Sequence, residues 1–211
     1  MLFDADGTLI DTYDMILTSM RYTVNDQYGN NASDAELMSL VGTPLYDQML
    51  VFAQGDTCQA TEMVEVHRNH NDAIHDKQIR TFPHVKETLS HLQEHGYRMG
   101  VITSKRHFLA ERGLRLCGIL PFFEFVIGSD DWPEHKPDPG PILHGCDLLG
   151  AKPDHCAYIG DSPFDIQAGN TAGCTTVAAL WGMFSPEELR DEHPHHECDA
   201  FIHLPNLFLQ P

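Results

Sequence analysis

Two carboxylates near the start of the chain are placed to hold a divalent cation between them. Asp4 and Asp6 follow an apolar run and precede Gly7, in the string Asp-Ala-Asp-Gly-Thr-Leu-Ile-Asp. Side chains two positions apart lie on the same face of an extended strand, so both carboxylates can reach one point. They repel each other unless a cation joins them, and Mg²⁺ is a hard ion that takes oxygen ligands. Because Gly7 permits a sharp backbone turn, we expect a strand that ends at a chemically active edge.

Three further segments place polar groups at the ends of predicted strands. Thr103 and Ser104 end an apolar run and precede a predicted helix, whose free N–H groups can help a hydroxyl to bind a phosphate oxygen. Lys136 precedes two nearby prolines, which restrict the backbone around it. Asp161 and Asp165 follow another apolar run and form a second pair of carboxylates. Ligands of open α/β sheets bind at the carboxyl ends of strands, so the segments together predict one joint site.

In this order, the four segments resemble the motifs of the haloacid dehalogenase-like hydrolase superfamily, and specifically those of its phosphatases. The resemblance implies that Asp4 attacks phosphorus and forms an aspartyl-phosphate. It implies that Asp6 protonates the leaving group and then activates the hydrolytic water, while Thr103 and Lys136 hold the transferring phosphoryl group. A carboxylate nucleophile splits hydrolysis into two easier steps, and phosphoryl transfer otherwise needs alignment and charge neutralisation.

The same resemblance implies a Mg²⁺ cofactor. Its ligands would be Asp4, Asp161 and the backbone carbonyl of Asp6. Asp165 would either steady Lys136 or reach the metal through water. The candidate metal residues are therefore Asp4, Asp6, Asp161 and Asp165, and the candidate substrate-binding residues are Gly7, Thr43, Tyr46, Thr103, Ser104 and Lys136.

The elements that must position these residues alternate between helix and strand after residue 80. Such alternation is typical of a parallel α/β sheet. The expected helices are 85–95, 106–116, 142–149 and 165–172, and the expected strands are 99–103, 125–127, 157–160 and 175–179. Residues 199–203 are a candidate last strand. The predicted fold class is therefore α/β, with a Rossmann-like parallel sheet core.

Residues 12–80 differ from the rest because only helices are predicted there. Apolar residues recur with a helical period, and the expected helices are 15–28, 34–41, 45–54 and 61–74. A helical block inserted after the first catalytic strand resembles the small C1 cap of the superfamily. We therefore expect a catalytic core of residues 1–11 and 81–211, with residues 12–80 forming an inserted helical cap that selects the substrate.

Two parts of this block could contact the leaving group. The glycine-proline turn at 41–47 carries Thr43 and Tyr46, and similar loops in this subclass face the active site, although an ordinary helix start is an equal alternative. A later helix carries His67, Arg68 and His75. With 14 histidines in the chain, most of them should be surface or core residues rather than ligands.

Composition limits the function further. The chain has 13 basic and 31 acidic residues, a net charge of −18, which argues against nucleic-acid binding. No apolar run is long enough to span a membrane, and the sequence shows no secretory signal pattern. The six scattered cysteines indicate reduced thiols and a cytoplasmic enzyme. The histidine-rich residues 193–198 fit no zinc pattern, so we expect a solvated loop there.

The expected substrate is a small phosphorylated metabolite or pyrophosphate. Within the superfamily, a bacterial pyrophosphatase and phosphoglycolate phosphatase are both similar, and the oligomeric state is not indicated. A sugar phosphomutase would use the same core and return the phosphoryl group to its substrate. A non-catalytic phosphate- or metal-binding regulatory protein is a further alternative, but the presence of Asp4, Asp6 and Lys136 favours an enzyme. A dehalogenase would lack the acid Asp6.

Overall fold

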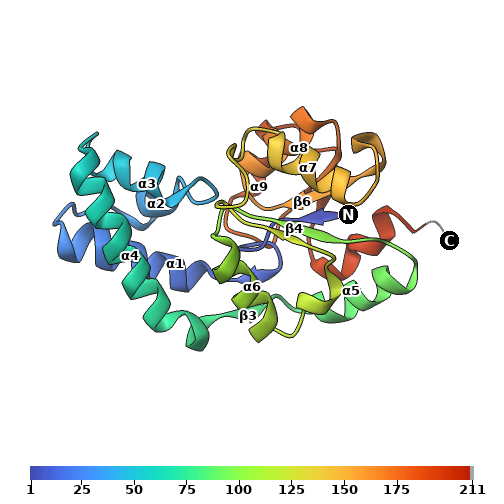
Figure 1. Ribbon diagram of the computed structural model, residues 1–211, viewed down its shortest axis with the longest axis horizontal. Helices are drawn as coiled ribbons and strands as arrows, with labels where there is room; N and C mark the ends of the chain where they lie inside the picture. The colour runs from blue at the N-terminus through green and yellow to red at the C-terminus, as the bar shows by residue number, and fades with distance from the viewer. Residues whose placement is uncertain (210–211) are drawn as a thin grey trace.

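A six-stranded parallel sheet forms the centre of the computed structural model, which describes residues 1–209 (Figure 1). The strands are, in spatial order, β5 (Val126–Ile127), β4 (Gly100–Ile102), β1 (Leu2–Phe3), β6 (Ala157–Gly160), β7 (Thr175–Ala179) and β8 (His196–Cys198). Every neighbouring pair is parallel. The first strand therefore lies inside the sheet, with Leu2 opposite both Gly100 and Tyr158. This confirms the predicted α/β fold class.

Helices cover both faces of the sheet, because neighbouring side chains of a strand point to opposite faces. Phe3 and Ile159 belong to the apolar core under α5 (Val85–Glu94), α6 (His107–Leu116) and the 3₁₀ segment Phe201–Leu207. Leu2 and Tyr158 belong to the opposite core, under α7 (Gly140–Leu148) and α8 (Pro163–Ala172). Strands buried on both faces are thus fixed in register, and the residues that follow them are fixed as well.

The helices of residues 12–80, here called the cap segment, gather to one side of the sheet (Figure 1). They are α1 (Tyr13–Met20), its continuation in wider π-helical turns over Arg21–Gln27, α2 (Asp34–Met38), α3 (Leu45–Phe52) and α4 (Thr57–Gln78). Met20, Met49 and Met63 are fully buried among these helices, in an apolar core separate from those of the sheet.

A short two-stranded ladder joins the cap segment to the sheet. The chain leaves through β2 (Ile10–Asp11) and returns through β3 (Arg80–Thr81), which pair in antiparallel fashion. Arg80 also forms an ion pair with Asp11 at 2.7 Å. The predicted division at residues 11/12 follows β2 and that at 80/81 falls within β3, and the division into two domains stays a prediction.

Several boundaries differ from the sequence expectations: α2 ends at Met38 rather than at residue 41, α4 ends at Gln78 rather than at residue 74, and α8 begins at Pro163 rather than at residue 165. Helix α4 begins at Thr57 rather than at residue 61, because the Asp56 side chain accepts hydrogen bonds from the backbone N–H groups of Cys58 and Gln59. The expected last strand at 199–203 is wrong: the strand is His196–Cys198, within the stretch expected to be a solvated loop. Residues 201–207 form 3₁₀ turns instead, since Phe201 and Leu204 are buried in the core.

The remaining short elements connect the larger ones. They are α9 (Pro186–Asp191) and the 3₁₀ turns Leu120–Phe122 and Pro153–His155. Among residues 1–209, no helix is both long enough and apolar enough to cross a bilayer.

Candidate active site

The carboxyl ends of three adjacent strands bring the predicted residues together. Asp4 follows β1, Thr103 follows β4 and Asp161 follows β6, and these strands are neighbours in the order β4-β1-β6. Lys136 comes from the loop after β5, and Asp165 from the first turn of α8. All five side chains belong to buried residues. The motifs, which are separate in the sequence, thus form one cluster at a single edge of the sheet, as expected for ligand sites of this fold class.

A buried ammonium group links two of the carboxylates. Lys136 Nζ donates to Asp4 Oδ1 at 2.8 Å and to Asp165 Oδ1 at 2.5 Å. Burial alone would lower the pKa of Lys136, but the Asp165 and Asp4 carboxylates raise that pKa well above its usual value. Lys136 is therefore a fixed positive charge at the carboxyl edge.

Asp165 is held firmly by its neighbours. Its Oδ1 atom also accepts a hydrogen bond from the Tyr158 hydroxyl at 3.2 Å. Its Oδ2 atom accepts from the Ser162 backbone N–H at 3.0 Å and from the Ser162 hydroxyl at 2.5 Å, so Ser162 and Asp165 form a capping box at the start of α8. Of the two roles considered for Asp165, these contacts favour the steadying of Lys136.

Three carboxylates lie close enough to share a cation. One oxygen each of Asp4, Asp161 and Asp165 can be chosen so that all lie within 4.8 Å of one another. Burial, followed by repulsion from Asp165, raises the pKa of Asp4 to about 7 despite the attraction of Lys136. Burial and the two other carboxylates raise the pKa of Asp161 well above its usual value. Because Lys136 neutralises one of three negative charges, a divalent cation would balance the cluster.

Asp161 lies in a close-fitting cradle that fixes its orientation. Its Oδ1 accepts from the Thr8 hydroxyl at 2.8 Å, and its Oδ2 accepts from the Met183 backbone N–H at 2.8 Å. A Cβ atom at Gly7 or at Gly182 would come within 2.1 Å of the Asp161 side chain, and Gly7 has φ +81°. Gly7 therefore serves both the turn expected there and the close approach of Asp161, while substrate binding by Gly7 stays a prediction.

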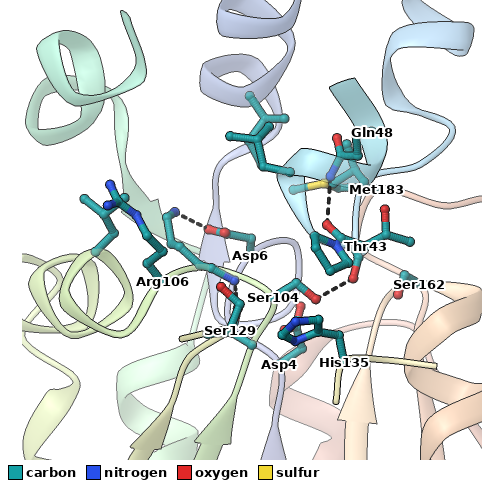
Figure 2. Close-up of a pocket in the computed structure, with 18 of the residues that line it drawn as sticks. Asp4, Asp6, Thr43, Gln48, Ser104, Arg106, Ser129, His135, Ser162 and Met183 are labelled. Carbon is teal, nitrogen blue, oxygen red and sulfur yellow. Dashed lines mark hydrogen bonds and ion pairs between the residues drawn. The ribbon is translucent and has the colours of Figure 1, made fainter. Parts of the chain in front are cut away.

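The expectation that the Asp4 and Asp6 carboxylates hold one cation between them is not met, because the group of carboxylates able to share a cation is Asp4, Asp161 and Asp165 and does not include Asp6. Asp6 Oδ1 accepts from Lys105 Nζ at 2.9 Å, a contact between positions far apart in the sequence (Figure 2). This arrangement agrees with metal binding through the Asp6 backbone carbonyl rather than its carboxylate. Lys105 was not predicted from the sequence, because one lysine beside Thr103 and Ser104 gives no pattern that identifies its partner.

Asp4, Thr103 and Asp161 line a cavity of about 230 Å³ between the sheet and the cap segment, whereas Lys136 and Asp165 lie behind them and outside its lining. Thr103 lines it, and its hydroxyl oxygen accepts only a 3.3 Å hydrogen bond from the Lys105 backbone within the described residues, so its proton is available to a ligand. Thr43 and Tyr46 also line the cavity, although their contact with substrate stays a prediction, and Gln48 donates to the Thr43 backbone carbonyl at 2.9 Å (Figure 2). The Thr43 hydroxyl donates a hydrogen bond to the Leu40 backbone carbonyl at 2.8 Å.

Ser104 connects the sheet to the cap segment. Its hydroxyl donates to the Gly42 carbonyl at 2.5 Å (Figure 2). A Cβ atom at Gly42 would approach Ser162 Oγ to 3.0 Å and the Phe164 ring to 3.1 Å, and the φ of Gly42 is +107°. The 41–44 turn thus packs closely on the edge of the sheet, and Ser104 supports that contact as well as being a candidate for substrate binding.

The cavity lining includes two of the three basic residues named from the sequence on the later cap helix, together with residues that were not candidates. His67 and Arg68 line the cavity, whereas His75 does not and instead contacts Asp76 at 2.9 Å. The additional lining residues with polar side chains are Gln48, Asn71, Lys105, Arg106, Ser129, His135 and Ser162. They come from helices and loops far apart in the chain, so local spacing does not reveal them.

The amino-acid sequence is similar to those of known proteins over most of its length. A family model described as haloacid dehalogenase-like hydrolase matches residues 1–179. A relative named pyrophosphatase PpaX, from Oceanobacillus iheyensis, is 36% identical over 196 residues, covering 93% of this chain and 90% of the relative.

Solved structures agree with these sequence matches. A Bacteroides fragilis protein, named provisionally as a haloacid dehalogenase-like hydrolase, has a TM-score of 0.90 at 27% identity, over 96% of this chain and 97% of its own. A Haemophilus somnus protein, described as a predicted phosphoglycolate phosphatase, has a TM-score of 0.83 at 25% identity, over 99% of this chain and 96% of its own. These matches extend over the cap segment as well as the sheet.

Proposed function

Because this chain belongs to the haloacid dehalogenase-like hydrolase family, in which it is a phosphatase, we propose that it hydrolyses pyrophosphate or another small phosphorylated metabolite through an aspartyl-phosphate. The observation that carries the proposal is the buried Lys136 ammonium, which joins Asp4, a residue of the cavity lining, to Asp165. A buried cation beside a buried carboxylate suits a reaction in which the carboxylate attacks a highly charged phosphoryl group.

Asp4 is the proposed nucleophile. Lys136 holds its Oδ1 atom, while within the described residues no hydrogen bond reaches its Oδ2 atom. Attack by Asp4 on phosphorus forms an O–P bond and breaks the bond to the leaving group. Lys136 and the Thr103 hydroxyl then lie where they can offset charge on the phosphoryl oxygens.

Asp6 is the proposed acid and base. Its side chain is partly exposed to the cavity, and the Lys105 ammonium holds it 2.9 Å away. In the first step Asp6 gives a proton to the leaving group, and in the second it takes one from the water that attacks the aspartyl-phosphate. The return of the proton restores the enzyme.

Mg²⁺ is the proposed cofactor, and Asp4, Asp161 and the Asp6 carbonyl would hold it. The donor set consists of oxygen atoms, and the net charge of the buried cluster suits a divalent ion. When bound, the ion would neutralise charge on the phosphoryl oxygens and on Asp4. Thr8 and the Met183 N–H would keep Asp161 oriented for this role.

Pyrophosphate is the first substrate to test, because the relative from Oceanobacillus iheyensis is named a pyrophosphatase. The name of the Haemophilus somnus protein supports phosphoglycolate as the second. A cytoplasmic location stays a prediction from the sequence.

The test is Mg²⁺-dependent phosphate release from pyrophosphate, phosphoglycolate and hexose phosphates, with kcat/KM compared across the panel. We expect a clear preference for one of the first two substrates and loss of turnover with EDTA. Turnover that persists in EDTA would contradict the metal proposal. Release from none of the substrates would contradict the proposed function.

A further inference from the structure

His67 is a buried histidine of helix α4 whose ring forms no hydrogen bond with any described residue. It is 7% exposed, it lines the cavity that also contains Asp4, and neither ring nitrogen forms a hydrogen bond within residues 1–209. A neutral imidazole carries one donor and one acceptor. Leaving buried polar groups unpaired costs about 1–3 kcal/mol each. A ligand in the cavity that accepts a hydrogen bond from His67 would remove part of this cost.

The cap side of the cavity carries no negative charge. The cap segment, residues 12–80, is rich in acidic residues, yet none of them lines the cavity. Arg68 of α4 lies in the lining, as do Lys105 and Arg106 from the loop after β4. Of the three clustered carboxylates, Asp4 and Asp161 line the cavity, and each follows a strand of the sheet. An anion on the cap side would therefore meet positive charge.

These positive groups are not equally available to a ligand. Lys105 is paired with Asp6 at 2.9 Å, and Arg68 contacts the exposed Glu65 at 3.2 Å. Within the described residues, the Arg106 side chain forms no hydrogen bond or ion pair, and it lies beside the Asp6 contact in Figure 2. Arg106 is therefore the positive side chain that is most available to bind a second anionic group.

The cavity is small for a ligand site. Its volume of about 230 Å³ is below the range of about 300–1,000 Å³ that is usual for ligand pockets. Part of this space must accept the phosphoryl group beside Asp4. What remains suits a compact leaving group such as phosphate or a two-carbon acid.

We propose that His67, together with Arg106 and Arg68, binds an anionic leaving group, so that the enzyme selects substrates with a second negative charge close to the transferred phosphoryl group. The inference rests on the proposed function, because it requires a phosphoryl group at Asp4. His67 donates a hydrogen bond to an oxygen of the leaving group, and the two arginines offset its charge. Burial lowers the pKa of His67 to about 4, and the nearby His70, Lys105 and Arg68 add to that effect. The His67 ring is therefore neutral when no ligand is bound.

The test compares leaving groups of similar size but different charge. Phosphoglycolate and ethyl phosphate differ in that glycolate carries a carboxylate where ethanol has a methyl group, and pyrophosphate provides a phosphate leaving group. We would measure kcat/KM for all three with the wild-type protein, His67→Ala and His67→Gln. The Gln side chain retains an N–H donor of similar reach. His70→Ala is the matched control, because His70 lies on the same helix, stacks on Tyr22 and does not line the cavity.

We expect His67→Ala to lower kcat/KM for the anionic leaving groups by about tenfold or more, as for a lost hydrogen bond to a charged group. Ethyl phosphate turnover should change little, and His67→Gln should recover part of the loss. A loss confined to pyrophosphate identifies phosphate as the bound group, and a loss confined to phosphoglycolate identifies a carboxylate.

Two results would overturn the inference. An equal loss for all three substrates, or the same loss in His70→Ala, would show that His67 only supports the cap segment. Unchanged selectivity in a folded His67→Ala protein would show that water satisfies the ring. Failure of the proposed function is distinguishable from both, because the wild-type protein would then hydrolyse none of the three substrates, and the leaving-group site would be rejected with it.

Discussion

Asp4 is the residue on which the proposed chemistry depends most directly. An Asn at this position keeps an oxygen that can accept the 2.8 Å hydrogen bond from Lys136 but cannot attack phosphorus as a carboxylate does. We expect Asp4→Asn to reduce turnover by at least about 10³-fold. The variant should remain folded, since Asn has nearly the shape of Asp and Lys136 stays paired with Asp165. Phosphate release and far-UV circular dichroism of the same sample would check both expectations, and turnover equal to the wild type would refute the proposed nucleophile.

Thr8 should control metal affinity without touching the metal. Its fully buried hydroxyl donates to Asp161 Oδ1, so Thr8→Val keeps the shape of the site but removes the hydrogen bond that orients Asp161. Loss of such a supporting contact typically weakens metal binding by about 10–100-fold. We therefore expect the Mg²⁺ concentration for half-maximal activity to rise by about tenfold or more.

Thr12→Val is the matched control for that experiment. Thr12 is equally buried, but its hydroxyl has no hydrogen-bond partner among the described residues. Its replacement should leave the Mg²⁺ requirement unchanged. An equal rise in both variants would mean that any change in a buried threonine disturbs the site.

Helix α4 is the element that presents His67 and Arg68 to the cavity, and its start is a testable source of stability. Asp56 caps it by accepting hydrogen bonds from Cys58 and Gln59. Asp56→Ala should lower the free energy of unfolding by about 1 kcal/mol, measured by urea denaturation. Asp72→Ala, an exposed change within the same helix, should stay within about 0.5 kcal/mol. If Asp56→Ala and Asp72→Ala lower the free energy of unfolding equally, the hydrogen bonds that the Asp56 side chain accepts at the start of α4 are not the cause.

The elements of the sheet were predictable because each catalytic motif follows an apolar run. Strands buried on both faces have uninterrupted apolar sequences, and this is why β4 and β6 were found near their true positions. Strand β8 has two exposed residues, His196 and Glu197, and only Cys198 is buried. Its sequence therefore lacks the apolar signal, and its pairing with β7 decides its structure.

Helix α9 was missed although a local signal was present. Ser185 and Glu188 form a capping box, and a proline occupies the first helical position. A serine followed three residues later by glutamate is a recognised helix start. The contacts of Lys105, Arg106 and His67 are a different case, because they depend on how the cap segment packs against the sheet. No spacing rule within one segment contains that information.

At the scale of the whole molecule, a chain of net charge −18 must attract both an anionic substrate and a cation. The structure combines both kinds of group at the cavity: the buried Asp4 and Asp161 line it at the ends of β1 and β6, and Arg68 of α4 and Lys105 and Arg106 of the loop after β4 line it as well. The acidic excess elsewhere raises the local concentration of cations and favours solubility. Local positive groups, rather than net charge, must therefore position the substrate.

The buried carboxylates should couple stability, pH and metal binding. In the metal-free protein the pKa of Asp4 is about 7, compared with a usual value of 3.8, and the pKa of Asp161 is also raised. The folded state therefore keeps protons that the unfolded state releases. Stability of the metal-free protein should fall as pH rises through the window from about 4 to about 7.

Mg²⁺ competes with these protons, since it binds the deprotonated carboxylates. If one proton must leave Asp4 before Mg²⁺ binds, the apparent affinity for Mg²⁺ falls about tenfold for each pH unit below the pKa of Asp4. At about pH 5.5 the affinity is therefore lower by about thirtyfold. The rise in Tm caused by Mg²⁺ should therefore be larger at about pH 8 than at about pH 5.5. Sodium chloride at matched ionic strength corrects for screening of the acidic surface.

In Asp4→Asn the difference between the two pH values should shrink, because one of the competing protons is gone. If Mg²⁺ raises Tm equally at both pH values, the ion binds the outer acidic surface instead of the buried carboxylates.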